Sequence, residues 1–202
     1  ANWTGGSDDN WSYVKNNQYY GKKNVHMNKV NVQVTKDNNT AQNLFKSGKV
    51  QETSVTADYV KGNKNNKELH TSLMATQYYL YFNGKNDLTK NENFRQAVNY
   101  AFDNNQLAKK VLQDGSVGAT GWVPKGDMKN PKNGQDFAEE AGHLQKQNKK
   151  KAQDYWKATQ KDLGKKNMTL NLLADNTDDQ KQVAEYLQST LQKQFKGLKV
   201  GV

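Results

Sequence analysis

Apolar residues recur along this chain in short periodic runs, separated by stretches rich in Lys and Asn. Residues 30–34 alternate valine with polar side chains, and a period of two predicts a half-buried strand. In residues 38–47 the apolar positions share one helical face and Gly48 follows, which predicts a short helix with a glycine C-cap. Residues 1–24 show neither period, so we expect them to be mostly irregular.

The most organised stretch predicts two helices in tandem. Thr89 and Glu92 have the spacing of a capping box ahead of an apolar run that extends to about residue 101. Asp103 and Gln106 repeat that spacing ahead of a second apolar run, which Gly115 is placed to end. Capping of this kind contributes on the order of 1 kcal/mol per helix end.

The C-terminal third predicts a helix–strand–helix–strand series. A polar loop over 124–146, with one helical turn near 136–141, precedes a helix over 148–163 and a strand over 168–173. A long helix then begins at Thr177 or Asp178, and a strand follows from Leu198. Because a strand–helix–strand unit normally makes a parallel pair, the fold class is α/β, with a mixed sheet flanked by helices.

Positive charge raises two alternatives for the partner. The 202 residues carry a formal net charge of +10, which could attract nucleic acid or an anionic surface such as a cell wall or membrane face. The sequence has a single arginine, Arg95, and arginine supplies the bidentate contacts that read guanine and clamp phosphate. The composition therefore argues against a nucleic-acid partner and favours a surface or solubility role.

Cysteine usage and apolar run lengths exclude several classes. The chain has no Cys, which excludes disulfides, thiolate nucleophiles and Cys-type zinc sites. No run approaches the roughly 18–20 apolar residues of a membrane span. The sequence starts without Met or a signal-peptide pattern and stops directly after a predicted strand, so we expect it to be one excised part of a larger protein.

No constellation of residues predicts catalysis, a metal site or a cofactor. His26, His70 and His143 lie outside helical reach of one another. The carboxylate pairs are adjacent in sequence and point in different directions, whereas general acid–base catalysis needs groups that converge across a cleft. Nucleotide-binding glycine motifs and nucleophile motifs are absent. We therefore expect a protein that is not an enzyme.

Aromatic residues are the remaining candidates for function. The run "QYYLYFN", residues 77–83, predicts a strand with Tyr78 and Phe82 on one side and Tyr79 and Tyr81 on the other. These side chains either pack in the core or line a cleft in which a tyrosine ring stacks on a ligand. Trp122, in a Gly-Trp-Val-Pro loop, is either an exposed anchor or a plug beneath the loop.

The tandem-helix region resembles the oligopeptide-binding proteins of bacterial ABC importers, the family 5 extracellular solute-binding proteins. The similarity rests on Arg95-Gln96-Ala97 in the first helix, on Asp103 at the start of the second, and on the loop Ala119-Thr120-x-x-Val123-Pro124-x-Gly126. The flanks, residues 13–50 and 170–195, are similar as well.

The resemblance implies a fold and a function. It implies that residues 1–202 form a single α/β lobe of a type II periplasmic-binding-protein-like clamshell, whose second lobe belongs to the same protein. Members of the family are exported lipoproteins at the outer face of the cytoplasmic membrane. They close around an extended oligopeptide by a hinge motion and deliver it to an ABC permease.

The resemblance also selects ligand-binding candidates. Tyr78 and Tyr79 match a strand that contributes cleft contacts, Asp178 and Gln180 match a helix start that can approach the ligand, and Trp122 lies near the cleft rim by analogy. Helix capping is the alternative role for Asp178.

Two other hypotheses stay open at this point. The family resemblance also includes nickel–chelate, disaccharide and pheromone binders, so the ligand class is not fixed. Outside the family, the chain could be a basic nucleic-acid- or cell-wall-binding module without a transport role.

Overall fold

The computed structural model describes residues 9–144 and 146–202. Internal contacts divide the chain into two compact units, one ending at Ser54 and one spanning Val55–Val202. Each unit is described by itself. The prediction that residues 1–202 form a single lobe stays a prediction.

The first unit contains an antiparallel strand pair and one helix. Strand β1 (Asn10–Val14) pairs with β2 (Lys29–Gln33), with Trp11 opposite Val32, and the short η1 (Lys22–Asn24) lies in the connection. Strand β2 was predicted, whereas β1 was not, since residues 1–24 were expected to be mostly irregular; residues 1–8 of that range lie outside the described residues. The first strand escapes notice because its sequence, NWSYV, does not alternate strictly between apolar and polar residues.

Helix α1 (Asn38–Lys46) follows the expected capping rules. The Asp37 carboxylate accepts a hydrogen bond from the Thr40 backbone N–H at 2.7 Å, which satisfies one of the unpaired donors of the first turn. Hydrogen bonding to its charged form lowers the pKa of Asp37. After the helix, Gly48 adopts a φ of +72°, in the left-handed conformation that glycine tolerates.

The second unit opens with short helices. Helix α2 (Ala57–Gly62) is followed by α3 (Asp87–Lys90), α4 (Glu92–Ala101), α5 (Asn104–Gln106) and the π-helical η2 (Leu107–Leu112). Asp103 caps α5 as predicted, by accepting from the backbone N–H groups of Asn105 and Gln106. The tandem helices are therefore confirmed, with a π-helical continuation of the second that the sequence pattern does not reveal.

Two predicted helix boundaries are wrong. The side chains of Asn86 and Asn91, not Thr89, cap α3 and α4, because each asparagine oxygen accepts from backbone N–H groups of the following turn. The Thr89 hydroxyl donates to the carbonyl of Asn83 instead. The second helix ends at Leu112, and Gln113, with a positive φ of 51°, takes the C-cap position ahead of Gly115.

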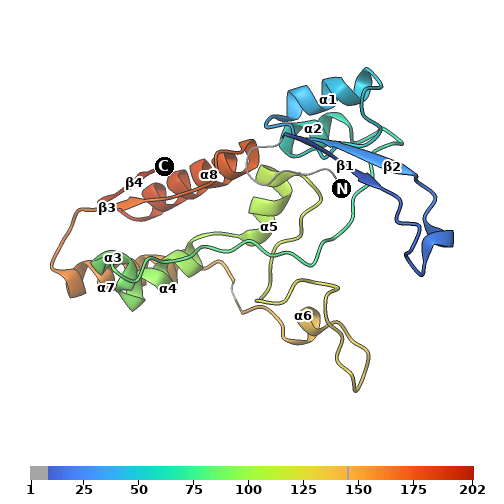
Figure 1. The fold of residues 1–202 in the computed structure, drawn as a ribbon. Helices are drawn as coiled ribbons and strands as arrows, with labels where there is room; N and C mark the ends of the chain where they lie inside the picture. The colour runs from blue at the N-terminus through green and yellow to red at the C-terminus, as the bar shows by residue number, and fades with distance from the viewer. Residues whose placement is uncertain (1–8, 145) are drawn as a thin grey trace. The chain divides into compact units, whose positions relative to one another are not determined.

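One short helix, two long helices and a parallel strand pair complete this unit. They are α6 (Phe137–Glu140), α7 (Lys149–Leu163), β3 (Met168–Asn171), α8 (Asp178–Gln194) and β4 (Leu198–Gly201). Strands β3 and β4 pair in parallel, with Met168 opposite Leu198, as the strand–helix–strand pattern predicts. Figure 1 shows α4 beside α7 and α8 beside the strand pair.

The α/β class is confirmed, but the arrangement of its strands differs from the prediction. In the described residues the strands form two separate two-stranded sheets, one antiparallel and one parallel, and not one mixed sheet.

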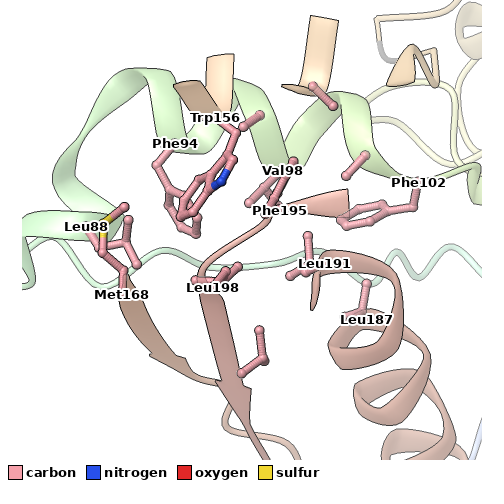
Figure 2. Close-up of a cluster of buried hydrophobic side chains, with 14 residues drawn as sticks. Leu88, Phe94, Val98, Phe102, Trp156, Met168, Leu187, Leu191, Phe195 and Leu198 are labelled. Carbon is pink, nitrogen blue, oxygen red and sulfur yellow. The ribbon is translucent and has the colours of Figure 1, made fainter. Parts of the chain in front are cut away.

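Aromatic rings organise the core of the second unit (Figure 2). The Trp156 ring stacks on Phe195 at a centroid distance of 5.2 Å and meets Phe94 at 6.2 Å. Its indole N–H donates to the carbonyl of Lys196 at 3.0 Å, so the polar atom of this buried ring is satisfied. Helices α4 and α7 are thereby tied to the turn between α8 and β4.

Candidate functional site

The aromatic segment of residues 77–83 is not a strand. In the described part of the chain, the backbone of residues 70–82 forms no hydrogen bond with the backbone of any other residue. The segment runs as an elongated stretch before α3 (Figure 1). The side-chain composition of the segment suits a strand. A strand, however, requires backbone hydrogen bonds to an adjacent strand, and the described residues form none with this segment. Its N–H and C=O groups therefore have no backbone partner among the described residues.

The tyrosines of this segment are exposed. Tyr78, Tyr79 and Tyr81 expose 74%, 66% and 86% of their surface. Phe82 instead packs edge-on against Phe94 at 6.3 Å and fixes the end of the segment to the core. The alternative that the tyrosines form a core is therefore wrong.

The structure brings two of the predicted site residues together. The rings of Tyr79 and Trp122 meet edge to face, with centroids 5.6 Å apart. Trp122 is 72% exposed, which identifies it as an exposed loop residue and excludes the alternative of a buried plug. The two residues form an exposed aromatic pair that joins the elongated segment to the Gly-Trp-Val-Pro loop.

A polar contact missed by the sequence analysis supports this pair. The Gln77 amide donates to the Gly121 carbonyl, next to Trp122 and 44 positions away in the chain. No sequence pattern links a glutamine to a backbone carbonyl so distant, so only the structure reveals the contact.

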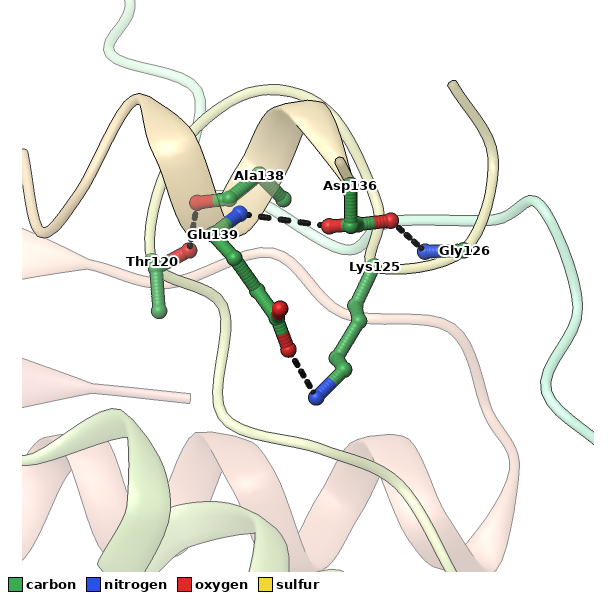
Figure 3. Close-up of polar contacts among 6 residues, drawn as sticks. All are labelled: Thr120, Lys125, Gly126, Asp136, Ala138 and Glu139. Atoms are coloured by element: carbon green, nitrogen blue, oxygen red, sulfur yellow. Dashed lines mark hydrogen bonds and ion pairs between the residues drawn. The ribbon is translucent and has the colours of Figure 1, made fainter. Parts of the chain in front are cut away.

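The loop that carries Trp122 is closed by hydrogen bonds to the region of α6 (Figure 3). One Asp136 oxygen accepts from the Gly126 backbone N–H at 2.6 Å, while the other accepts from Glu139 at 3.2 Å and caps α6. The Lys125 ammonium pairs with the Glu139 carboxylate, which raises the pKa of Lys125.

A backbone contact also closes the loop on its other side. The Leu144 N–H donates to the Thr120 carbonyl at 2.8 Å. These contacts tether the loop that carries Trp122 to the region of α6.

The other two predicted residues lie at the start of α8. The N-cap position belongs to Thr177, so Asp178 is the first helical residue and is exposed, while Gln180 is half-buried. Among the described residues, no hydrogen bond, ion pair or ring contact joins either residue to Tyr79 or Trp122. The acidic first turn of α8 complements the helix dipole, and a ligand role for Asp178 and Gln180 stays a prediction.

A cavity of about 670 Å³ lies at the start of β3 and β4 and includes none of the five predicted residues. Its lining includes Leu88, Leu163 and Met168 together with Asp87 and Lys165. The aromatic pair, in contrast, lies on an exposed surface.

The described residues contain neither a candidate metal cluster nor a candidate membrane-spanning helix. His, Asp and Glu side chains in residues 9–144 and 146–202 form no cluster of three that could hold a metal ion. Among the helices that the structure describes, none is long and apolar enough to cross a membrane.

Comparison with known proteins decides the family. The family described as bacterial extracellular solute-binding proteins, family 5 middle, matches residues 1–202. The chain belongs to this family. The predicted resemblance is thereby confirmed, as is the extracellular class of protein that the family's description states.

Individual relatives support the same assignment. The chain is 32% identical to a dipeptide-binding protein of Lactococcus lactis subsp. cremoris over 99% of its own length and 38% of the relative. It is similar to the structure of the pheromone receptor PrgZ, with 41% identity, a TM-score of 0.88 and coverage of 98% of this chain and 39% of PrgZ. It is also similar to the peptide-bound structure of OppA from Listeria monocytogenes, with 35% identity and a TM-score of 0.86. That match covers 100% of this chain and 40% of OppA.

These relatives confirm the predicted placement of the chain in the type II periplasmic-binding-protein fold. The chain spans about two fifths of the length of the relatives that it matches.

Proposed function

We propose that the protein containing this chain captures oligopeptides outside the cell and passes them, chemically unchanged, to an ABC permease. The observation that carries the proposal is the exposed segment at Tyr78 and Tyr79, whose backbone is unpaired and which lies against Trp122. In this proposal the protein is anchored to the outer face of the cytoplasmic membrane. A second lobe, which other parts of the same protein form, closes over the peptide.

The segment suits an extended peptide in two ways. Free backbone N–H and C=O groups can pair with a peptide backbone, which gives affinity that depends little on peptide sequence. Exposed tyrosine and tryptophan rings supply apolar area with polar tips, and such residues are enriched in binding sites. The peptide-bound structure of the Listeria relative supports a peptide as the ligand class.

The only arginine also supports a partner other than nucleic acid. The Arg95 guanidinium donates to the carbonyls of Thr89 and Lys90 at the end of α3. It is committed to a helix C-terminus, so the chain has no free bidentate group for phosphate or guanine.

Calorimetry on the full-length protein with peptides of three to six residues tests the proposal. Replacing Tyr78 and Tyr79 together with alanine should weaken binding roughly thirtyfold, because interface tyrosines commonly contribute more than 1 kcal/mol each. Tyr13→Ala, which removes a tyrosine that is 52% exposed in the other unit, should leave the affinity unchanged.

The recovered peptide should have its original mass, because the protein binds without catalysis. Unchanged peptide affinity in a folded Tyr78→Ala/Tyr79→Ala protein would refute the site. Exclusive binding of a metal chelate or a sugar would refute the ligand class.

A further inference from the structure

Lysine is concentrated on and around helix α7. Residues 146–166 contain eight lysines and two aspartates, and all eight lysines are exposed. In the part of the chain that the structure describes, the one ion pair is Lys125–Glu139, so no carboxylate lies within salt-bridge distance of these lysines. Asp154 and Asp162 offset part of the positive charge of α7, and none of its lysines forms a salt bridge within the described chain.

Three of these lysines form a stripe directly opposite the buried face of α7. Lys150, Lys157 and Lys161 are spaced by seven and four residues, which places them within about 40° of one another around the helix. The stripe is about 16 Å long, at 1.5 Å per residue. Ala152, Trp156 and Thr159 occupy the other side and are buried in the core.

Two loop lysines have their backbone carbonyls on the flank of α7 that adjoins its buried face, and not beside the stripe. The Gln160 amide donates to the carbonyls of Lys166 and Lys196 at 2.8 and 3.3 Å, which holds both loops against α7. The basic patch is therefore the stripe itself, which consists of the three exposed residues Lys150, Lys157 and Lys161. All three side chains come from α7.

Helix stability does not explain this charge. The first turn of α7 holds Lys149, Lys150 and Lys151 and no acidic residue, an arrangement that opposes the helix dipole. Lys151 lies over the ring of Tyr100 at 5.1 Å and so has a structural contact. Among the described residues the lysines of the basic patch make no salt bridge and no ring contact, and the charge of Lys161 acts on the neighbouring Asp162, so the ammonium groups of the patch can meet a partner.

We propose that the basic patch docks on a bilayer surface rich in anionic phospholipid. Lysine ammonium groups act as point charges that attract phosphate headgroups without requiring fixed geometry. A straight stripe on an exposed helix matches a flat, laterally charged surface better than it matches a single anion, which would need a concave site. Because the apolar face of α7 is buried in the core, the contact is peripheral and electrostatic, without helix insertion.

The choice of a lipid surface rests on the proposed function, which places the protein beside a membrane. The docking would hold the protein close to the bilayer while leaving the aromatic segment to the ligand. Asp154 lies on the exposed side of α7, one turn from Lys150, and reduces the charge of the patch.

Vesicle co-sedimentation with the full-length protein stripped of any lipid anchor tests the proposal. Binding to phosphatidylglycerol-containing vesicles should exceed binding to pure phosphatidylcholine vesicles, and should fall steeply between 50 and about 500 mM salt because exposed charges are screened. The Lys150→Gln/Lys157→Gln/Lys161→Gln variant should bind roughly a hundredfold more weakly, at about fivefold per lysine near the surface. Asp154→Asn should bind about fivefold more tightly.

A matched control separates the patch from net charge alone. Lys61, Lys64 and Lys67 are equally exposed and lie in another part of the same unit. Changing all three to glutamine removes the same charge and should have little effect. Equal losses in the two triple variants, or no anionic-lipid binding by the unaltered protein, would overturn the proposal.

Two further readouts complete the test. Binding of soluble polyphosphate without binding of the vesicles would also overturn the lipid assignment, in favour of an anionic polymer. Peptide affinity should be the same in both triple variants, so a failure of the patch remains distinguishable from a failure of the proposed function.

Discussion

The ring of Tyr79 lies edge-on to the ring of Trp122, with centroids 5.6 Å apart, although 43 positions separate the two residues in the chain. Edge-to-face geometry places the positive rim of one ring against the negative face of the other. The contact joins an elongated segment without a strand partner to a loop closed by Asp136, and it orients both rings on an exposed surface.

This ring contact should be measurable as a coupling free energy. In a double-mutant cycle of Tyr79→Ala and Trp122→Ala, we expect a coupling of about 0.5 kcal/mol in the free energy of unfolding, at the low end for aromatic pairs because both rings are exposed. Urea denaturation of the four proteins measures it.

Tyr79→Phe provides the control for this cycle. The variant keeps the ring and removes the hydroxyl, so its coupling to Trp122 should match that of the unaltered protein. A coupling of zero would contradict the edge-to-face pair. A coupling lost in Tyr79→Phe would assign the contact to the hydroxyl.

A second prediction concerns the turn that joins α8 to β4. Gly197 has a φ of +89°, and a Cβ at this position would lie 2.1 Å from the carbonyl oxygen of Lys166. Gly197→Ala should therefore lower the free energy of unfolding by about 3 kcal/mol or more, because backbone strain and a clash with backbone act together. Equilibrium unfolding in urea measures the loss.

Gly164→Ala is the matched control for that turn. Gly164 caps α7 with a φ of +63°, and a Cβ there would meet no atom within 4 Å. Its loss should be about 1 kcal/mol, which is the strain contribution alone. If the two variants lost the same free energy of unfolding, the close approach of position 197 to the Lys166 carbonyl would contribute nothing measurable to stability.

Local sequence signals predicted the helical parts of this fold well. The Asp103 cap is encoded within a few residues, so capping rules find it. The parallel pairing of β3 with β4 joins residues 30 positions apart, and the order strand–helix–strand predicts it. The family resemblance supplied the fold of the whole, which no local rule specifies.

The elements that the sequence analysis got wrong depend on distant partners. The aromatic run at residues 77–83 has strand composition, but a strand exists only if a second strand pairs with it, and composition does not show whether one is present. The same holds for the site, since the Gln77–Gly121 hydrogen bond and the Tyr79–Trp122 contact both join residues more than 40 positions apart. Tyr79 and Trp122 could be identified as candidates from the sequence, whereas the contact between them could not.

The last prediction concerns the pH dependence of the contact between α4 and α7. The Asp162 carboxylate accepts hydrogen bonds from the side-chain amides of Asn91 and Asn93 at 3.1 and 2.8 Å, and these bonds lower the pKa of Asp162. A carboxyl whose pKa is lower in the folded state stabilises the fold above its unfolded pKa of about 3.9, and this contribution is lost as the pH falls through the folded pKa.

The melting temperature of the unaltered protein should therefore exceed that of Asp162→Asn at pH 6, and the gap should close as the pH falls below about 4. Asp154→Asn, which removes an exposed carboxylate on the same helix that accepts no hydrogen bond among the described residues, should follow the pH profile of the unaltered protein. A gap between the unaltered protein and Asp162→Asn that stayed constant from pH 6 to pH 2 would show that the two asparagines do not favour the charged carboxylate.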